Sequence, residues 1–398
     1  MLFRAPTRRT HPGDIDVDRR SVLADWATRT LLGDLRAWPL ESNSPDLQAA
    51  REFFNAESIA PLCRHALKSG HAEALIPAEV QDMLGEATWA NAAVELLRAD
   101  QDTHVIRCLD DIGLRPLVLK GAAYARWLYP ENYLRPRCDT DLLFADRESA
   151  ERAWKCLEKE GYRLRQNVVE GRFISHQKTC EKPGGAGHAI DVHWAISNTH
   201  TFVRALPYDH LDQQAQPLTS LHQSARTLGA VHSLIFACLH LFGHERCEHL
   251  TRIIWLYDIY LLSGRMTEAD WVECSRIAIE GGVAGICRHA LDQVGERFPV
   301  RGVEIIRQEL LEAEPKEVFR PDRLNNNWSY AITDLRALEG WAARIQWIRE
   351  TILPSPAYIM QKYGKTHDTW LPLLYLHRAG RGFLKQIRLK NRPDRSKR

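Results

Sequence analysis

Residues 135–144 read RPRCDTDLLF, and they decide the fold that we predict for this chain. Polar and apolar side chains alternate before an apolar end, which is typical of a β-strand anchored in a core. Because side chains two residues apart on a strand point to the same face, Asp139 and Asp141 are expected side by side. Two adjacent carboxylates repel each other unless a divalent cation neutralises them, and hard oxygen ligands suit Mg²⁺. A solvated pair on an ordinary surface strand is the alternative.

A second polar step lies one predicted helix and one loop upstream. The segment 115–119, RPLVL, predicts a short buried strand, and Lys120 and Gly121 follow it at the start of a helix. Glycine lets a phosphate approach the backbone, a helix N-terminus attracts anions, and lysine adds a positive charge. The same dipeptide also fits an ordinary strand-to-helix turn.

A third carboxylate interrupts the apolar segment 189–194, AIDVHW. Alternation places Asp191 and His193 on one face of this predicted strand. An aspartate inside a core is costly unless it is paired, so a site at this strand would explain it. A solvent-facing strand is the alternative. For His193, pairing with Asp191 or a phosphate and a purely structural hydrogen bond both remain open.

The pattern around these motifs predicts an α/β unit between helical regions. Strands are expected at 115–119, 138–144, 162–169, 173–180 and 188–194, with helices at 122–128 and 148–161. Helical patterns cover much of 20–111 and the segments 225–245, 250–262, 268–280, 283–298 and 328–351, whereas 299–327 looks irregular. We therefore expect a helical region over 1–113, an α/β core over 114–219, a helical domain over 220–380 and a basic tail over 381–398.

Composition excludes several classes of protein. The 398 residues are 44% apolar, which is ample for a globular core, and the net charge of +2 gives no argument for nucleic-acid binding. Nine cysteines without a CxxC pair exclude a zinc ribbon and a disulfide framework, so we expect reduced thiols and a fold that survives zinc removal. The first residues lack a secretory signal, and the most apolar run, 233–242, is shorter than the ~20 residues of a membrane span. We expect a cytoplasmic protein without a membrane anchor.

Together the motifs resemble the uncharacterised nucleotidyltransferase family of the DNA polymerase β-type superfamily. The likeness rests on LVLKG at 117–121, RPRCDTDLLF at 135–144, EKEGY at 158–162 and AIDVHW at 189–194. It continues through SLIFACLHLFGH at 233–244, RIIWLYDIYLL at 252–262 and ILPSPAYI at 352–359, and it covers roughly residues 20–380. It implies an α+β fold, with a small mixed-sheet polymerase-β-like nucleotidyltransferase core flanked by N-terminal and C-terminal helical regions.

The resemblance also implies a reaction, the Mg²⁺-dependent transfer of a nucleoside monophosphate from an NTP to an acceptor hydroxyl. Asp139 and Asp141 would bind two metal ions, and Asp191 would complete the triad. Lys120 and Gly121 stand where the superfamily usually has Gly-Ser, so this chain lacks that serine. The acceptor stays open among small molecules, peptides and sugars, and a nucleic-acid acceptor is not favoured.

Arg135 and Arg137 are expected to stabilise phosphate charge because they approach the carboxylates along the chain. Two other reactions remain open. One is a phosphotransferase that moves the γ-phosphate with the same carboxylates, although the chain has no G-x-G-x-x-G loop. The other is a catalytically silent nucleotide- or partner-binding module, which the missing serine suggests.

Three further features lie in the C-terminal half. His240 and His244 are four residues apart on a predicted helix and could hold zinc, but no third ligand is evident, so we interpret them as packed histidines. Asp258 is a single acid in an apolar helix and must find a partner, such as Arg252 or a histidine. The basic run from 378 to 398 is interpreted as a solvated tail that could also contact an anion.

Overall fold

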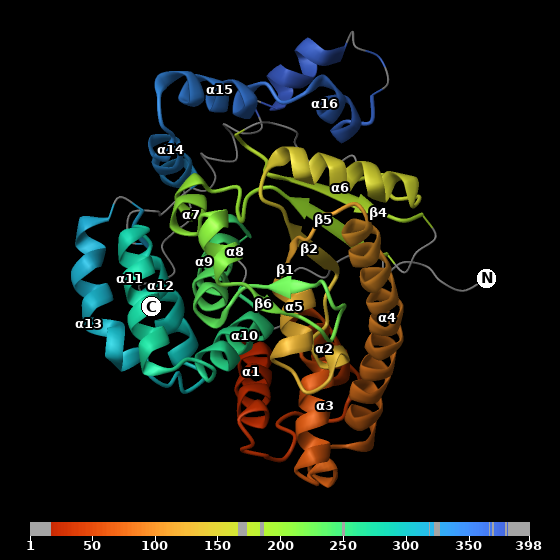
Figure 1. Cartoon of the computed structure of the whole chain (residues 1–398). Coiled ribbons are helices and arrows are strands. Elements are labelled where there is room, and N and C mark those ends of the chain that lie inside the picture. Colours follow the sequence, from red (N-terminus) through yellow and green to blue (C-terminus); the bar gives the residue numbers. More distant parts are fainter. Residues whose placement is uncertain are drawn as a thin grey trace.

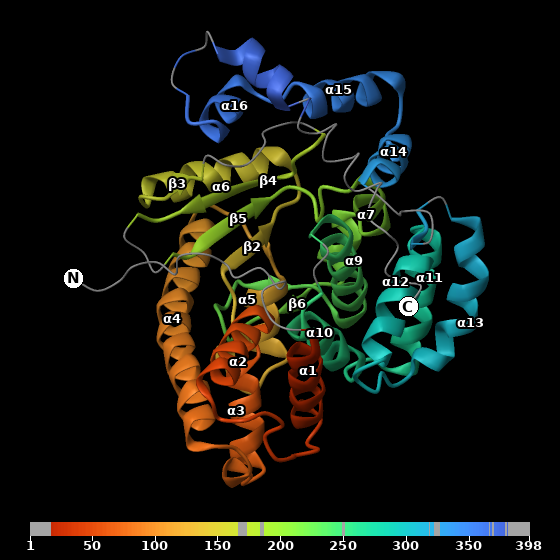
Figure 2. The same cartoon turned by 180° about the vertical axis from the view of Figure 1, so that it is seen from behind.

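The computed structural model describes residues 17–165, 173–183, 187–248, 251–317, 319–321, 327–365, 367, 370–378 and 380. Within these ranges a seven-stranded mixed sheet lies between two sets of helices (Figures 1 and 2). The strands follow the order β3-β4-β5-β2-β1-β7-β6 across the sheet. Their bounds are β1 Leu117–Leu119, β2 Asp139–Leu143, β3 Arg163–Leu164, β4 Gln177–Glu181, β5 Ala189–His193, β6 Gln216–Pro217 and β7 Arg226–Thr227.

The centre of the sheet combines parallel and antiparallel pairs. β2 pairs in parallel with β5 and antiparallel with β1, while β4 pairs antiparallel with β5. β1 also pairs in parallel with β7, so the sheet extends beyond residue 219, where we expected the α/β core to end. The apolar ends of β1 and β2 are buried, which anchors the middle of the sheet in the core.

The helices of the N-terminal region pack against one another, and the longest of them lies along one side of the sheet. They are α1 Val17–Leu31, α2 Ser44–Glu57, α3 Ala60–Ser69 and the long α4 Ala78–Asp111, with a 3-10 turn η1 Glu73–Leu75. The Asn43 side chain caps α2 by accepting a hydrogen bond of 3.0 Å from the Asp46 N–H. α4 ends before Gly113, whose φ of +74° is one that glycine adopts at little cost. In Figures 1 and 2, α4 runs along this side of the sheet.

Two helices connect the central strands. α5, Lys120–Trp127, follows β1, and α6, Arg147–Lys159, links β2 to the β3–β4 pair, with a 3-10 turn η2, Asn132–Leu134, before β2. Asp146 caps α6 because its carboxylate accepts a 2.7 Å hydrogen bond from the Ser149 N–H. α6 packs against α4. These contacts hold the segments on both sides of β2 in place.

The helices of residues 200–313 form the side of the molecule opposite α4, and those of residues 327–362 lie along its top in Figure 1. α9 and α10 pack against each other, and α9 also contacts α11 and α12. Their bounds are α7 His200–Ala205, α8 Tyr208–Gln213, α9 Ala230–Glu248, α10 Ile253–Ser263, α11 Glu268–Glu280, α12 Ala284–Gly295, α13 Val303–Ala313, η3 Glu314–Lys316, α14 Asn327–Ala337, α15 Trp341–Ile352 and α16 Pro356–Lys362. No helix among the described residues has the length and apolar character that crossing a bilayer requires.

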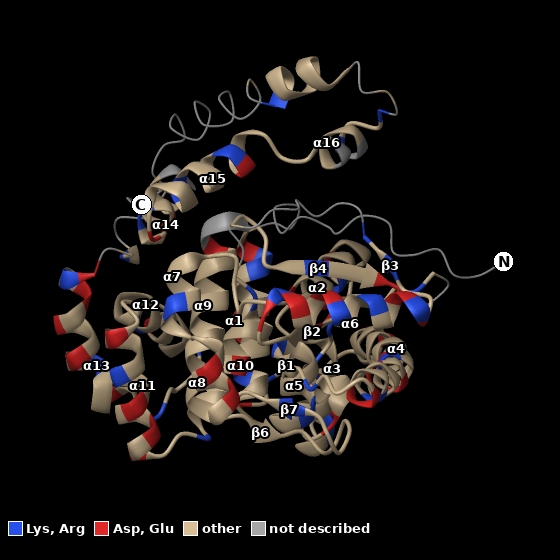
Figure 3. Cartoon of the chain, turned by 45° about the horizontal axis from the view of Figure 1, so that its top comes forward, with Lys and Arg blue, Asp and Glu red and all other residues tan. Residues whose placement is uncertain are grey.

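Exposed faces of the helices carry both signs of charge. Figure 3 shows acidic and basic residues interspersed along α6 and α11. On α11, for example, Arg276 pairs with Glu273 and Glu280 at the surface. This mixture agrees with the small net charge of the chain.

Most predicted elements are confirmed, and several expectations are wrong. The helix predicted over 328–351 is two helices, α14 and α15, which residues 338–340 separate, and residues 166–169 of the strand predicted over 162–169 lie outside the described residues. The predicted helix over 268–280 coincides with α11. Residues 299–327 are not irregular throughout, because α13 buries Val303, Ile306 and Leu310 at helical spacing. The helix predicted from 225 starts later, since Arg226 and Thr227 belong to β7. The basic tail predicted for 381–398 lies outside the described residues.

Candidate active site

The register between β2 and β5 determines where the predicted acids meet. Asp141 lies directly opposite Asp191, and the parallel pairing places the side chains of both on the same face of the sheet. Asp139 begins β2 two residues earlier on this face, and His193 ends β5 two residues after Asp191. Side chains that are distant in sequence therefore share one surface, which we call the carboxylate face and define by Asp139, Asp141, Asp191 and His193.

Asp141 is the centre of this face and is buried. Its Oδ1 accepts a hydrogen bond from the Lys120 Nζ at 3.1 Å and lies 2.9 Å from the His193 Nε2. Candidate ligand atoms of Asp141, Asp191 and His193 all lie within 4.8 Å of one another. The histidine thus contacts Asp141, whereas the sequence suggested Asp191 or a phosphate as its partner.

The charges on the carboxylate face change one another's pKa values. Burial raises the pKa of Asp139 and of Asp191, and the negative charge of Asp141 raises both further. Burial would also raise the pKa of Asp141, but the charges and hydrogen bonds of Lys120 and His193 outweigh it and lower that pKa. Burial would lower the pKa of Lys120, but the neighbouring carboxylates raise it, so the ammonium stays protonated. The face holds three acids against one permanent cation.

Lys120 occupies a strained backbone position. Its φ is +46°, in the left-handed region that residues with a side chain rarely adopt. Such a conformation costs about 1–3 kcal/mol and persists only where surrounding contacts hold it. Here the buried strand β1 precedes the residue, and the ion pair with Asp141 fixes its side chain. The strained backbone at Lys120 therefore lies at the turn between β1 and α5, next to the carboxylates.

Arg135 holds the loop before β2 against the C-terminal helices. Its Nε donates to the Asp258 Oδ1 at 3.0 Å and its Nη2 to Oδ2 at 2.6 Å, while the Tyr129 hydroxyl donates to the same carboxylate at 2.7 Å. Asp258 has therefore found a partner, although it is neither Arg252 nor a histidine. A Cβ on Gly121 would lie 2.6 Å from the Arg135 Nη1, so glycine is required there to make room for this guanidinium.

Arg137 belongs to the opposite face of β2. It donates to Glu95 at 2.8 Å, to the Thr140 hydroxyl at 2.6 Å and forms an ion pair with Asp102 at 2.8 Å. Thr140 alternates with the two aspartates and so points away from them. The guanidinium of Arg137 thus contacts α4 instead of the carboxylate face, and we replace its expected phosphate contact with a role in positioning β2. The guanidinium of Arg135 is likewise committed to Asp258.

α9 lies beside Lys120, at one edge of the carboxylate face. The Lys120 Nζ lies 5.6 Å from the centre of the Phe236 ring, and burial with the charge of Lys120 lowers the pKa of His240. His240 and His244 pack against Trp255, with ring centroids 5.3 and 4.7 Å from it. These ring contacts agree with the interpretation of the pair as packed histidines. α9 therefore provides one wall beside the acids.

The donor set fits a divalent cation. Asp191 Oδ1 is buried and has no hydrogen-bond partner among the described residues. A buried carboxylate oxygen without a partner is costly, and a cation would satisfy it. The neighbouring donors are carboxylate oxygens and one imidazole, which suit magnesium or manganese better than softer ions. The ligand atoms close enough to share an ion belong to Asp141, Asp191 and His193, and Asp139 begins the same strand face two residues before Asp141.

Sequence reasoning missed the groups that support this face from behind. Glu95 and Asp102 lie seven residues apart on α4, one helical face of two turns, and both are buried. His188 lies 2.9 Å from the Thr140 hydroxyl through its Nε2 and 3.1 Å from the Gln101 Oε1 through its Nδ1. Buried acids at that spacing on a helix were a signal, but their partner on β2 was not evident from sequence.

Comparison with known protein families agrees with this geometry. The sequence profile of the family described as uncharacterised nucleotidyltransferase matches residues 43–299, which include the whole carboxylate face and α9. No curated protein matches the chain. The matched region covers more than half of the 398 residues and contains the mixed sheet with its flanking helices. The chain therefore belongs to the uncharacterised nucleotidyltransferase family.

Proposed function

We propose that the protein transfers a nucleoside monophosphate from an NTP to an acceptor hydroxyl, with Asp139, Asp141 and Asp191 holding divalent cations, Mg²⁺ by preference. One observation carries the proposal: the buried Asp191 Oδ1, which lacks a hydrogen-bond partner among the described residues, lies beside the acids of β2. An arrangement of excess negative charge in a core is costly unless a cation completes it.

Bound divalent ions would lower the pKa of the acceptor hydroxyl and stabilise the charge on the leaving pyrophosphate. The chain's own residues orient the ligands. His193 holds Asp141 by its Nε2, 2.9 Å from Oδ1, which leaves the other oxygen of Asp141 to face the substrate. Thr179 lies opposite Asp191 on β4, and its hydrogen bond helps to keep that carboxylate charged. Asp191 is the group that orients the acceptor hydroxyl.

The first turn of α5 is the proposed site for the triphosphate. α5 starts at Lys120 immediately after β1, and its N-cap residue Leu119 has no side chain that can accept the first N–H groups. These donors and the Lys120 ammonium favour an anion at this end of the helix. The left-handed backbone at Lys120 supports this proposal, since strain of this kind gathers at functional turns.

The reaction balances without a further reagent. A bond forms between the acceptor oxygen and the α-phosphorus, and the bond from that phosphorus to the β-phosphate oxygen breaks. The hydroxyl proton passes to the Asp191 carboxylate and from there to solvent, while pyrophosphate leaves with its electron pair. Asp191 is placed for this step because it lies directly opposite Asp141 on the neighbouring strand, beside the proposed ions.

Water can replace the unidentified acceptor in a test of this proposal. The protein is incubated with Mg²⁺ and each NTP labelled at the α- or the γ-phosphate, and the products are separated. We expect slow formation of NMP and pyrophosphate, since attack occurs at the α-phosphorus. Asp141→Asn should reduce the rate on the order of a thousandfold or more, because a charge that holds the cations is lost.

The control is Asp209→Asn, which removes a carboxylate from an exposed position on α8 and should leave the rate unchanged. Release of NDP and labelled phosphate would contradict nucleotidyl transfer and would assign a γ-phosphotransferase. Equal rates in the wild type and Asp141→Asn would show that the turnover comes from a contaminant.

A second candidate function is a silent nucleotide-binding module, and one contact favours it. Lys120 and His193 both engage the Asp141 Oδ1, so this carboxylate has partners even without a cation. A silent protein would bind Mg²⁺–NTP, measured by isothermal titration, but would release neither pyrophosphate nor phosphate. Pyrophosphate release above that of Asp141→Asn would exclude it.

A further inference from the structure

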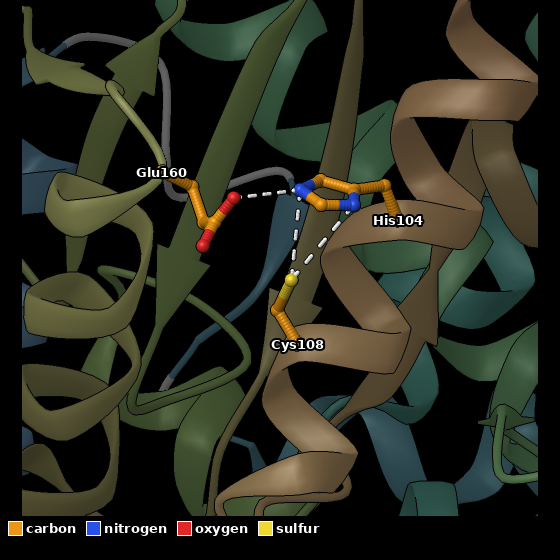
Figure 4. A group of neighbouring side chains, drawn as sticks. All are labelled: His104, Cys108 and Glu160. Atoms are coloured by element: carbon orange, nitrogen blue, oxygen red, sulfur yellow. Dashed lines mark hydrogen bonds and ion pairs between the residues drawn. The ribbon is translucent and has the colours of Figure 1, made fainter.

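Four residues with metal-binding side chains lie where α4 packs against the end of α6. His104 and Cys108 are one helical turn apart on α4, and Cys156 and Glu160 are one turn apart at the end of α6. Residues four apart on a helix share a face, so each helix presents a pair of ligand types. Figure 4 shows His104, Cys108 and Glu160 pointing toward one another. This group lies away from the carboxylate face and contains a sulfur ligand, which that face lacks.

The distances approach those of a tetrahedral site. The Cys108 Sγ lies 3.6 Å from the His104 Nε2, and zinc bonds of about 2.3 Å to sulfur and about 2.0–2.1 Å to nitrogen give a separation of roughly 3.6 Å. The His104 Nε2 and the Glu160 Oε2 are 2.8 Å apart, which is a hydrogen bond that an ion would replace. One ligand atom from each of the three residues lies within 4.8 Å of the other two.

Solvent can reach this cluster, and a fourth ligand is at hand. The side chains of His104 and Glu160 are 34% and 38% exposed, so an ion has access. The Cys156 Sγ donates a hydrogen bond of 3.6 Å to the Cys108 carbonyl and lies on the same face of α6 as Glu160. Either this thiol or a water molecule would complete the shell.

We propose that His104, Cys108 and Glu160 form a second metal site, which takes a borderline-soft divalent ion of the zinc class. A thiolate with an imidazole and a carboxylate suits zinc and disfavours magnesium, so the two sites select different ions. The ion would connect the end of α6 to α4, whose residues Glu95 and Asp102 hold β2 from behind. The expectation that no zinc cluster exists considered ligand spacing within the sequence, and these ligands come from two helices.

Cobalt is a suitable probe because a thiolate ligand gives Co²⁺ a near-ultraviolet charge-transfer band that oxygen and nitrogen ligands do not give. The reduced full-length chain is titrated with CoCl₂, and Zn²⁺ is then added to displace the cobalt. We expect a band that saturates at one equivalent, bleaches with Zn²⁺, is reduced in Cys108→Ser and is absent when Cys108→Ser is combined with Cys156→Ser. His104→Gln should raise the apparent Kd at least about tenfold, since loss of a weaker, indirect contact already costs that much.

The matched control is Cys138→Ser, which removes an exposed thiol outside the cluster and should leave the band unchanged. A reduced band in Cys156→Ser would assign the fourth ligand to that thiol, and an unchanged band would assign it to water; both agree with the proposal. It is overturned if the wild type shows no band, if Cys108→Ser leaves the band unchanged, or if the double variant of Cys108 and Cys156 retains it. Circular dichroism of each variant shows that loss of the band is not loss of the fold.

Discussion

The two faces of β2 differ in how their charges are compensated. On the carboxylate face, three acids lie near one lysine and one histidine, both of which pair with Asp141, and the Asp191 Oδ1 has no hydrogen-bond partner among the described residues. On the other face, Arg126 and Arg137 meet Glu95 and Asp102 at 2.8 to 3.8 Å, so two cations face two acids. Neighbouring residues of β2 thus belong to two different networks. The acids of the carboxylate face outnumber its cations, whereas the cations and acids of the other face are equal in number.

This difference separates binding from stability. Removing one charged side chain from a balanced buried network strongly destabilises the fold, because the remaining partners stay desolvated and unpaired. An unbalanced cluster of acids destabilises the chain until a cation arrives, and this is typical of a binding site. We call the face of β2 that carries Thr140 and meets Arg126, Arg137, Glu95 and Asp102 the back face. Substitutions on the back face should therefore mainly change stability, whereas those on the carboxylate face should mainly change activity and ion binding.

The largest expected effect is on the back face. Arg137→Met removes a cation between Glu95 and Asp102 and should lower the free energy of unfolding by about 3–5 kcal/mol. Urea unfolding measures it. Arg276→Met, which breaks two surface ion pairs on α11, is the control and should change little. Similar losses in both variants would show that the back network is no more important than a surface pair.

On the carboxylate face, Asp191→Asn should lower activity without lowering the stability of the fold. Turnover should fall roughly a hundredfold or more, since a charge that orients the acceptor is lost. The melting temperature without ions should rise or stay constant, because the variant removes repulsion from Asp141. The rise in melting temperature that Mg²⁺ with NTP gives the wild type should disappear. A large drop in ion-free stability would mean that Asp191 is a structural residue like those behind it.

The pH dependence of stability should also depend on a residue of the back face. Burial lowers the pKa of His188 to about 4, so this histidine is neutral in the fold but takes up a proton in the unfolded chain below about pH 6.5. Its contribution to stability is complete above that pH and is lost as the pH falls toward 4. Between pH 7 and 5 the loss should be roughly 2 kcal/mol. Urea unfolding of His188→Gln should show a correspondingly smaller pH dependence, and an unchanged dependence would contradict it.

The smallest expected effects concern Lys120, which should affect both nucleotide binding and the stability of the fold. Lys120→Ala should weaken Mg²⁺–NTP binding about tenfold, or about 1.4 kcal/mol, by removing a charge near the phosphates. Lys120→Gly removes the same charge but relieves the left-handed backbone, so it should be more stable than Lys120→Ala by about 1 kcal/mol. Titration calorimetry measures the loss of nucleotide affinity, and urea unfolding measures the difference in stability between the two variants. Equal stability of the two variants would show that the backbone at this turn carries no strain.

Much of the fold could be predicted from local patterns. The apolar spacing of α6 and α11 is regular, so both were expected close to their observed bounds, and the structure adds side-chain caps at Asp146 and Thr267. α13 was missed because its charged residues hide a short apolar stripe. β7 was missed because two residues are too few for a period-two pattern, and only pairing with β1 makes them a strand.

The candidate site was only partly predictable for the same reason. Alternation within β2 and β5 was enough to expect Asp139 with Asp141, and Asp191 with His193, on common faces. The partners of the two arginines were not predictable, because Arg135 contacts Asp258 far along the chain and Arg137 contacts α4. Proximity to the acids in sequence suggested a phosphate contact for both, and packing directs both guanidinium groups to buried carboxylates instead.

By itself, the sequence determined which residues of β2 and β5 share a face, where α6 and α11 lie along the chain, and the family to which the chain belongs. These follow from backbone geometry and residue type over a few neighbouring positions, which a sequence contains in full. Only the tertiary structure decided that Asp141 lies opposite Asp191, and that His104 and Cys108 meet Glu160. Strand register and helix packing depend on contacts between segments that are far apart in the chain, and a local pattern does not specify them.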